Sequence, residues 1–277
     1  MSATTALKDQ NVASTATPVY TLFDSIETDH LEREAMARLA SGTLGAIRVR
    51  EFFTPEQCRE IMRALETCDM GSYDEQLVQP RIAKLGPATY DFYGHEVLPP
   101  AYWEHAEQSD MSRSGLLHGG DPLDEATRKL EKVWGGPVRR ATSGGRSMFA
   151  GMIREINASA KMHFDEVVRE FPGVVDNIPV CQLAFNCHLA MPEVGGEAVV
   201  YRRTWKPSDE QHRDGYGYAE SLVADEPYVS VQAAVGDAIL FDPRNYHLVR
   251  PNVSEGRRVT LSFFLGITAE GSLSIWS

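Results

Sequence analysis

The sequence predicts an α+β fold in which helices come first and a run of short strands closes the chain. Helical periodicity dominates up to about residue 135, and after residue 145 short apolar segments alternate with glycine-bearing turns. Separation of helices and strands along a chain is typical of α+β proteins. With 277 residues and no second boundary, we expect a flexible tail at 1–17 and one domain at 18–277.

Four helices and one strand are expected before residue 145. The helices are predicted to begin near residues 29, 54, 101 and 122, and the strand to span 45–53. At Thr54, Pro55 takes the first helical position and Gln57 completes a capping box. The first helix takes Thr28-Asp29 as its cap and should end before Gly42.

The second half is predicted to be a series of strands. Their expected ranges are 148–156, 180–189, 198–205, 228–234, 238–241, 246–249 and 258–267. Each is short, and the turns between several of them contain glycine. This spacing is typical of an all-β closing half.

Composition excludes several classes of function. The chain has 27 Lys and Arg against 39 Asp and Glu, a formal net charge of -12, which argues against nucleic acid and anionic membranes as partners. No apolar run is long enough to span a bilayer, and the N-terminus lacks the features of a signal peptide. The four cysteines form no CxxC pair, so we expect reduced thiols, no zinc site among them and a cytoplasmic location.

Two histidines and one aspartate form a candidate metal site. In an extended segment His163 and Asp165 point to the same side, and His247 on another strand could complete the set. Two His and one carboxylate on one face are the ligands that hold Fe(II) with three positions open. The alternative is an exposed histidine ahead of a helix whose first turn contains Asp165 and Glu166.

A polar stripe on the last predicted strand is a candidate anion site. Arg258, Thr260 and Ser262 share one face by the period of two, and the other face is apolar. An arginine fork suits bidentate recognition of a carboxylate. Arg257 would take this role if the strand were shifted by one residue, but the alternation favours Arg258.

These residues resemble the iron(II)/2-oxoglutarate-dependent dioxygenases. The likeness lies in the segments around His163-x-Asp165 and from Gly236 through His247 to Ser262, and is strongest over 145–265. It implies a double-stranded β-helix core, a cupin-like jelly roll, supported by N-terminal helices.

A narrower branch of that superfamily is also similar. Met191–Tyr201 with Trp205, and Tyr93-Gly-His95, resemble the cyanobacterial indole-alkaloid halogenases and the hydroxylases of free or N-substituted amino acids. The substrate would then be a small molecule, a free or modified amino acid or a related natural-product precursor. The sequence leaves the oligomeric state open, with a homodimer as one option.

The resemblance implies a role for each candidate residue. Fe(II) would be ligated by His163, Asp165 and His247. The cosubstrate 2-oxoglutarate would chelate the metal, and Arg258 with Thr260 or Ser262 would bind its distal carboxylate. O2 would then yield a ferryl intermediate, with release of succinate and CO2.

Asp165 predicts the reaction outcome within this branch. The halogenases that this chain resembles have Gly or Ala at the position of Asp165, which leaves a metal coordination site for chloride. In this chain the carboxylate of Asp165 would occupy that site. We therefore expect hydroxylation. Desaturation, halogenation, a cupin-type dioxygenase that does not use 2-oxoglutarate, a protein hydroxylase and a binding protein with a vestigial metal site remain as alternatives.

The candidates for substrate binding are less defined. They are Glu166, Arg154, Tyr93 and His95. The loop at 72–100 and the insertion at 206–220 are expected to act as lids that exclude water. His188 lies on an apolar strand and is interpreted as a structural histidine.

Overall fold

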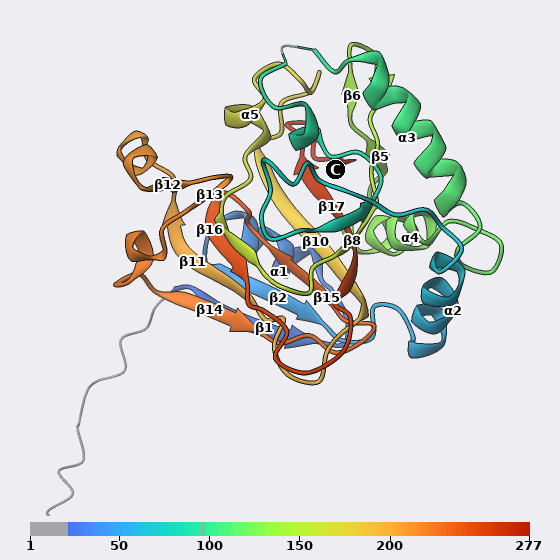
Figure 1. Ribbon diagram of the computed structural model, residues 1–277, viewed down its shortest axis with the longest axis horizontal. Helices are drawn as coiled ribbons and strands as arrows, with labels where there is room; N and C mark the ends of the chain where they lie inside the picture. The colour runs from blue at the N-terminus through green and yellow to red at the C-terminus, as the bar shows by residue number, and fades with distance from the viewer. Residues whose placement is uncertain (1–21, 96) are drawn as a thin grey trace, which may run out of the picture.

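The computed structural model describes residues 22–95 and 97–277, so the tail expected at 1–17 lies outside the described residues. Helices and strands are arranged around two β-sheets (Figure 1). Within the described ranges, no helix is both long and apolar enough to cross a bilayer. The predicted α+β class is confirmed, with most helices before residue 135 and most strands after it.

The larger sheet has ten strands. Along its main path the strands are β1 (Asp24–Thr28), β2 (Leu44–Val49), β15 (Ala238–Phe241), β10 (Cys181–Ala190), β17 (Val259–Ile267), β8 (Met152–Glu155), β4 (Ala83–Leu85) and β3 (Gly71–Ser72). β18 (Leu273–Trp276) pairs with the second half of β17 and with β5 (Val138–Arg140). The long strands β10 and β17 pair antiparallel along almost their whole length and form the centre of the sheet.

The smaller sheet has four strands and faces the larger one. Its order is β14 (Tyr228–Val231), β11 (Ala198–Thr204), β16 (Asn245–Val249) and β9 (Ala160–His163). One apolar cluster joins Ala184 and Ile239 of the larger sheet to Val200 and Val229 of the smaller one. The inner faces of the two sheets therefore enclose a common interior.

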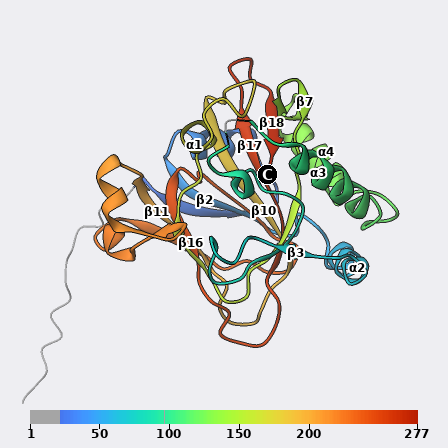
Figure 2. The ribbon, with the colours of Figure 1, turned by 45° about the horizontal axis from the view of Figure 1, so that its top comes forward.

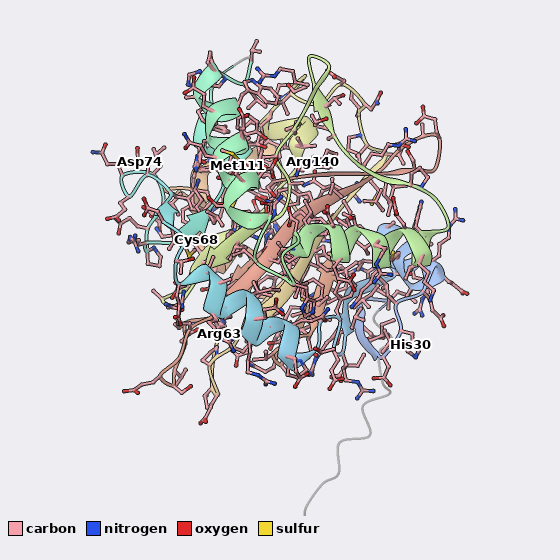
Figure 3. All side chains as sticks on the ribbon, turned by 90° about the vertical axis from the view of Figure 1, so that its right-hand side faces the viewer. His30, Arg63, Cys68, Asp74, Met111 and Arg140 are labelled. Carbon is pink, nitrogen blue, oxygen red and sulfur yellow. The ribbon has the colours of Figure 1, made fainter. Side chains whose placement is uncertain are left out.

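Helices cover the outer face of the larger sheet. They are α1 (Arg33–Ala40), α2 (Pro55–Leu65), α3 (Pro100–Arg113) and α4 (Pro122–Trp134). Figure 3 shows α2, α3 and α4 side by side, with Arg63 and Met111 on their outer surface. Leu39, Ile61 and Leu130 are buried against the larger sheet in the main core. Because the helices cover only the outer face of this sheet, its inner face is left to line the space between the two sheets.

Short elements fill the connections. They are η1 (Thr89–Phe92), β6 (Thr142–Ser143), β7 (Arg146–Ser147), α5 (Val167–Glu170), η2 (Pro207–His212), β12 (Arg213–Asp214), β13 (Gly217–Tyr218) and η3 (Glu220–Val223). The turned view in Figure 2 shows α2, α3 and α4 on one side of the molecule and the orange insertion at 206–220 on the other. The segments 72–100 and 206–220, which were expected to act as lids, consist mainly of loop with short strands and 3-10 helices.

Local sequence signals were reliable where no distant strand competed with them. The capping box at Thr54 is confirmed, because the side chains of Thr54 and Gln57 each accept the other's backbone N–H. The cap expected at Thr28-Asp29 is wrong. Residues 24–28 instead pair with β2 as strand β1, and α1 begins at Arg33 with no side-chain cap.

Two features of the strands also differ from expectation. The strand expected at 148–156 shortens to β8, because Gly151 has φ +84° and breaks the extended backbone. Strands β5 and β18 were not predicted, and they pair with each other across more than 130 residues. Pairing of that kind leaves no signal in the local sequence.

Candidate active site

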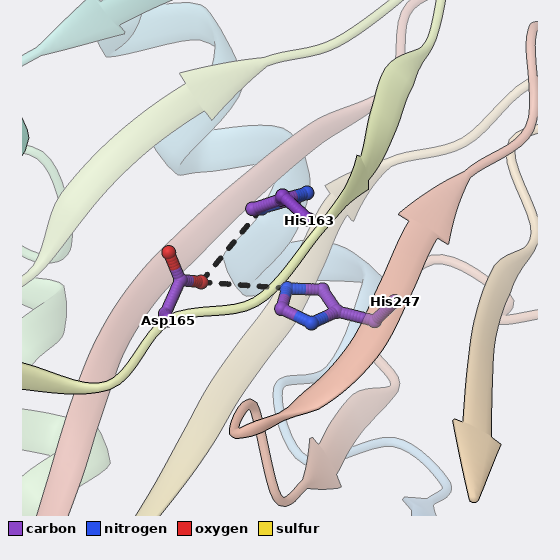
Figure 4. Close-up of side chains that lie close together, drawn as sticks. All are labelled: His163, Asp165 and His247. Carbon is purple, nitrogen blue, oxygen red and sulfur yellow. Dashed lines mark ion pairs between the residues drawn. The ribbon is translucent and has the colours of Figure 1, made fainter. Parts of the chain in front are cut away.

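Three candidate metal ligands lie close together where strands β9 and β16 of the smaller sheet pair. His163 ends β9 and lies directly opposite His247 of β16, and Asp165 follows two residues after His163. Asp165 Oδ2 is 3.7 Å from His163 Nε2 and 3.3 Å from His247 Nε2 (Figure 4). One ligand atom from each residue lies within 4.8 Å of the other two. The placement expected from the sequence is therefore found.

Backbone carbonyls fix both imidazole rings. His163 Nδ1 donates to the carbonyl of Lys161 at 2.7 Å, and His247 Nδ1 donates to that of Asn245 at 2.9 Å. With the proton held on Nδ1, each Nε2 presents its lone pair towards Asp165. A backbone carbonyl on the far nitrogen is the arrangement that orients metal-binding histidines.

The backbone at Asp165 is held by two further contacts. Its N–H donates to the carbonyl of Pro243 at 2.9 Å, and its carbonyl accepts from Gln182 Nε2 at 3.2 Å. Gln182 also accepts the N–H of Val167 at 2.9 Å, which ties β10 to the start of α5. The backbone that carries the carboxylate is thus held by two distant segments of the chain, at Gln182 and at Pro243.

The protonation states suit a metal. Burial, reinforced by His247, lowers the pKa of His163 to about 4, so its imidazole is neutral at pH 7. Burial opposes ionisation of Asp165, but the neighbouring imidazoles and Arg154 outweigh it and hold the pKa of this carboxyl below its usual range. Neutral imidazole and ionised carboxylate are the forms that bind metals.

The spacing also fits an octahedral ion. With bonds of about 2.1 Å, neighbouring ligands of such an ion are about 3 Å apart, close to the 3.3 and 3.7 Å observed. Two histidines and one carboxylate on one face are the ligand set of Fe(II) oxygenases. The residues present therefore fit Fe(II).

A cavity of about 990 Å³ opens between the two sheets beside these ligands. Its lining includes all three of them and Arg258. Arg258 is 3% exposed and, among the described residues, makes no ion pair; its Nε donates to the carbonyl of Gly196 at 2.9 Å. Burial, and then repulsion by Arg154, lower the pKa of Arg258 to about 9, so an anion in the cavity would stabilise its charge.

The strand register separates the two candidate arginines. Thr260 and Ser262 are buried on the same face of β17 as Arg258, with their hydroxyl oxygens 2.8 Å apart. Arg257 points outwards and pairs with Glu155 at 2.7 Å. Only Arg258 therefore faces the interior, as the alternation predicted.

His188 has a contact that the sequence did not suggest. It is buried in the cavity wall, where Nδ1 lies 3.1 Å from the carbonyl of Asp237 and Nε2 lies 3.3 Å from Arg258 Nη2. Burial, and then the charge of Arg258, lower the pKa of His188 to about 3. The ring is therefore neutral and accepts a hydrogen bond from Arg258.

A second cavity of about 620 Å³ adjoins the first and shares Asp165 and Arg154 with it. Glu166 lies in its wall as the residue before α5 and is paired with Arg169 at 2.6 Å. Glu170 was not singled out from the sequence, yet it lines both cavities. Burial, and then repulsion by Asp165, raise the pKa of Glu170 to about 8, so a cation beside this carboxyl would favour its ionised form.

The loop at 72–100 reaches the site, but not through the two residues proposed to bind substrate, Tyr93 and His95. Tyr73 and Tyr90 line both cavities. Tyr93 is 51% exposed and packs on Phe171, and His95 is exposed and packs on Phe92. Neither residue lines either of the two cavities described above. The loop therefore contributes to the wall of the site as predicted, but through Tyr90 and not through Tyr93.

The insertion at 206–220 also contacts the site. Tyr216 lines the first cavity, its ring lies 5.6 Å from that of His163, and its hydroxyl accepts the N–H of Lys161 at 2.7 Å. Tyr218 is buried instead against Tyr246. Both expected lids therefore contribute an aromatic side chain to the wall of the cavity.

Comparison with known proteins agrees with this geometry. The sequence profile of the family described as carrier-protein-independent halogenase WelO5 matches residues 22–277. The chain is 38% identical to L-γ-glutamyl-L-propargylglycine hydroxylase of Streptantibioticus cattleyicolor over 258 residues, 92% of this chain and 96% of that protein. It is 31% identical to leucinostatins biosynthesis cluster protein S of Purpureocillium lilacinum over 204 residues, 64% of this chain and 83% of that one.

A solved structure confirms the predicted jelly-roll fold. An N-substituted L-amino acid dioxygenase from Burkholderia ambifaria, crystallised with α-ketoglutarate, matches with a TM-score of 0.57 at 12% identity, over 88% of this chain and 90% of that one. At this identity the likeness is one of fold.

Proposed function

The chain belongs to the family of the carrier-protein-independent halogenase WelO5, within the iron(II)- and 2-oxoglutarate-dependent oxygenases, and from this premise we propose that it hydroxylates a small amino-acid-derived molecule. The reaction is R–H + 2-oxoglutarate + O2 → R–OH + succinate + CO2. The 38% identical relative is named as a hydroxylase of a γ-glutamyl amino acid. A free or modified amino acid is the substrate class that this supports.

Asp165 is the observation that carries the choice of hydroxylation. Its carboxylate lies 3.3 Å from His247 Nε2 and completes the set of protein ligands. An anion such as chloride would have to displace it or compete with its charge. Its ionised state and its anchored backbone both favour ligation by the protein.

Arg258 is proposed to bind the distal carboxylate of 2-oxoglutarate. Its guanidinium lies in the cavity without an anionic partner among the described residues, and Thr260 and Ser262 add hydroxyl donors on the same face. A carboxylate here would accept charge-assisted hydrogen bonds in a low-dielectric site. This favours a 2-oxoglutarate enzyme over a cupin-type dioxygenase that does not use this cosubstrate.

The remaining residues orient and protect the reaction. His163, Asp165 and His247 would hold Fe(II), which together with 2-oxoglutarate and O2 supplies the oxidising power for breaking a C–H bond. Tyr90 and Tyr216 come from the two surface insertions and restrict entry of water.

The test is coupled turnover of purified protein with Fe(II), 2-oxoglutarate, ascorbate and O2. A panel of free and γ-glutamyl amino acids, in buffer containing chloride, should give succinate together with a product that has gained one oxygen and no chlorine. His163→Ala and Asp165→Ala should each abolish product. Succinate that persists in both variants would contradict the metal assignment, and a chlorinated product would contradict hydroxylation.

The cosubstrate site has a matched control one residue away. Arg258→Ala should raise the KM for 2-oxoglutarate by roughly 10- to 100-fold, because a charged hydrogen-bonding partner is lost. Arg257→Ala removes the same charge from the outer face of the same strand and should leave the KM unchanged. Equal effects of the two substitutions would refute the assignment.

A further inference from the structure

Two charged residues in the wall of the second cavity, Arg154 and Glu170, do not form an ion pair with each other. Arg154 donates from Nη2 to Oδ1 of Asn186 at 3.2 Å, but its buried Nε finds no acceptor in the part of the chain that the structure describes. Glu170 makes one side-chain hydrogen bond within the described residues, in which it accepts the backbone N–H of Glu166 at 2.8 Å. Glu166 is already paired with Arg169, so Glu170 is the acid left for a ligand.

The rest of this cavity has a different character. Apolar side chains form much of its wall, including Val167, Phe171, Phe264 and Trp276. A fitting ligand therefore carries one positive group, one negative group and an apolar portion.

The position of the cavity links it to the metal site. Asp165 belongs to the walls of both cavities, whereas Arg258 lines the first and not the second. A ligand in the second cavity can therefore lie against the Asp165 side of the metal site while 2-oxoglutarate occupies the Arg258 side. The two cavities share Arg154, Asp165 and Glu170, so a ligand bound at Arg154 and Glu170 would lie where the second cavity meets the metal site.

We propose that the second cavity is the substrate compartment and binds a small zwitterion, with its ammonium at Glu170 and its carboxylate at Arg154. The ligand class is an L-amino acid or γ-glutamyl amino acid with an apolar side chain. This assignment rests on the proposed function, because it takes Asp165 as a metal ligand. Glu170, rather than Glu166, determines the preference for a free amine.

Binding without turnover tests the assignment. Protein loaded with Mn(II) in place of Fe(II), and with 2-oxoglutarate, is titrated calorimetrically with leucine, norvaline, phenylalanine, propargylglycine and their γ-glutamyl derivatives. Each compound is compared with its N-acetyl and methyl-ester forms. We expect the best zwitterion to lose about 10- to 100-fold in affinity on acetylation or esterification, as when a charged hydrogen bond is removed.

Variants then locate the two charges. Glu170→Gln keeps the acceptor for the N–H of Glu166 but should abolish the discrimination against N-acetyl forms, and Arg154→Gln should abolish that against esters. Glu131→Gln is a matched control, because Glu131 also accepts a backbone N–H, from Val138, but lines neither cavity. It should bind the panel as the native protein does.

The outcomes separate this inference from the proposed function. If 2-oxoglutarate itself does not bind the Mn(II) protein, the proposed function fails and this inference with it. If 2-oxoglutarate binds but no zwitterion does, or if N-acetyl forms bind equally well, only the substrate compartment is refuted. If Glu166→Gln alone removes the amine preference, the assignment to Glu170 is wrong.

Discussion

A single buried histidine connects the cosubstrate site to the rest of the sheet. His188 receives a hydrogen bond from Arg258 and is itself fixed by the carbonyl of Asp237. The carboxylate of Asp237 in turn pairs with Arg48 at 2.7 Å and accepts the N–H of Ala234. This chain of contacts holds the Arg258 guanidinium in one orientation before any anion binds, which is how a neighbouring residue can improve binding without touching the ligand.

His188→Ala is therefore expected to raise the KM for 2-oxoglutarate about tenfold with a smaller change in kcat, because Arg258 loses an acceptor that orients it. His188→Gln retains an acceptor near the position of Nε2 and should restore most of the affinity. Steady-state kinetics with varied 2-oxoglutarate give both values. A fall in kcat with unchanged KM, or no rescue by glutamine, would show that His188 serves only the packing of β10.

At the scale of elements, β17 shows how one strand serves two purposes. Val259, Leu261 and Phe263 lie in the main core with the helices, whereas Arg258 and Ser262 on the opposite face line the cavities. A shift of one residue would exchange these faces and place a guanidinium in the apolar core. The cost of that exchange fixes the register, and with it the identity of the arginine in the site.

The capping box of α2 gives a prediction at the same scale. Thr54→Ala removes the acceptor for the N–H of Gln57 and should lower the free energy of unfolding by about 1 kcal/mol. Urea denaturation followed by circular dichroism measures the change. Thr67→Ala, just beyond the other end of α2, removes a hydroxyl that donates to a carbonyl rather than caps the helix start, and should cost less. Equal losses would contradict the role of the box.

For the whole molecule, the interior between the sheets makes stability depend on pH. His188 has its pKa lowered from 6.5 to about 3 in the folded state, so the unfolded chain binds a proton more readily below pH 6.5. Stability is then fully present above pH 6.5 and is lost as the pH falls from about 6.5 towards 3, by up to about 1.4 kcal/mol per pH unit for this one group.

Urea unfolding between pH 7 and pH 4.5 should accordingly show a shallower loss of stability for His188→Gln than for the native protein. His30→Gln, at an exposed site, serves as the control and should follow the native curve. The difference between the curves isolates His188 from other groups that bind protons over this range. Parallel curves for all three proteins would refute the linkage.

Local patterns in the sequence determined the parts of this protein that depend on near neighbours. The spacing of His163 and Asp165, the alternation along 258–262 and the capping box at 54–57 follow from strand and helix geometry over a few residues. The sequence therefore sufficed to predict the α+β class, the convergence of the ligands and the inward direction of Arg258. The enzyme class followed from these together with the family resemblance.

Only the tertiary structure decided which polar groups are left without partners. Glu166 is paired with Arg169, whereas Glu170 has no ion pair within residues 22–95 and 97–277, and His188 contacts Arg258 from 70 residues away. Likewise β1 formed where a helix cap was expected, because pairing with β2 satisfies its backbone. The free energy of each such pairing depends on contacts between distant segments and on the exclusion of water. Neighbouring residues in the sequence determine neither of these.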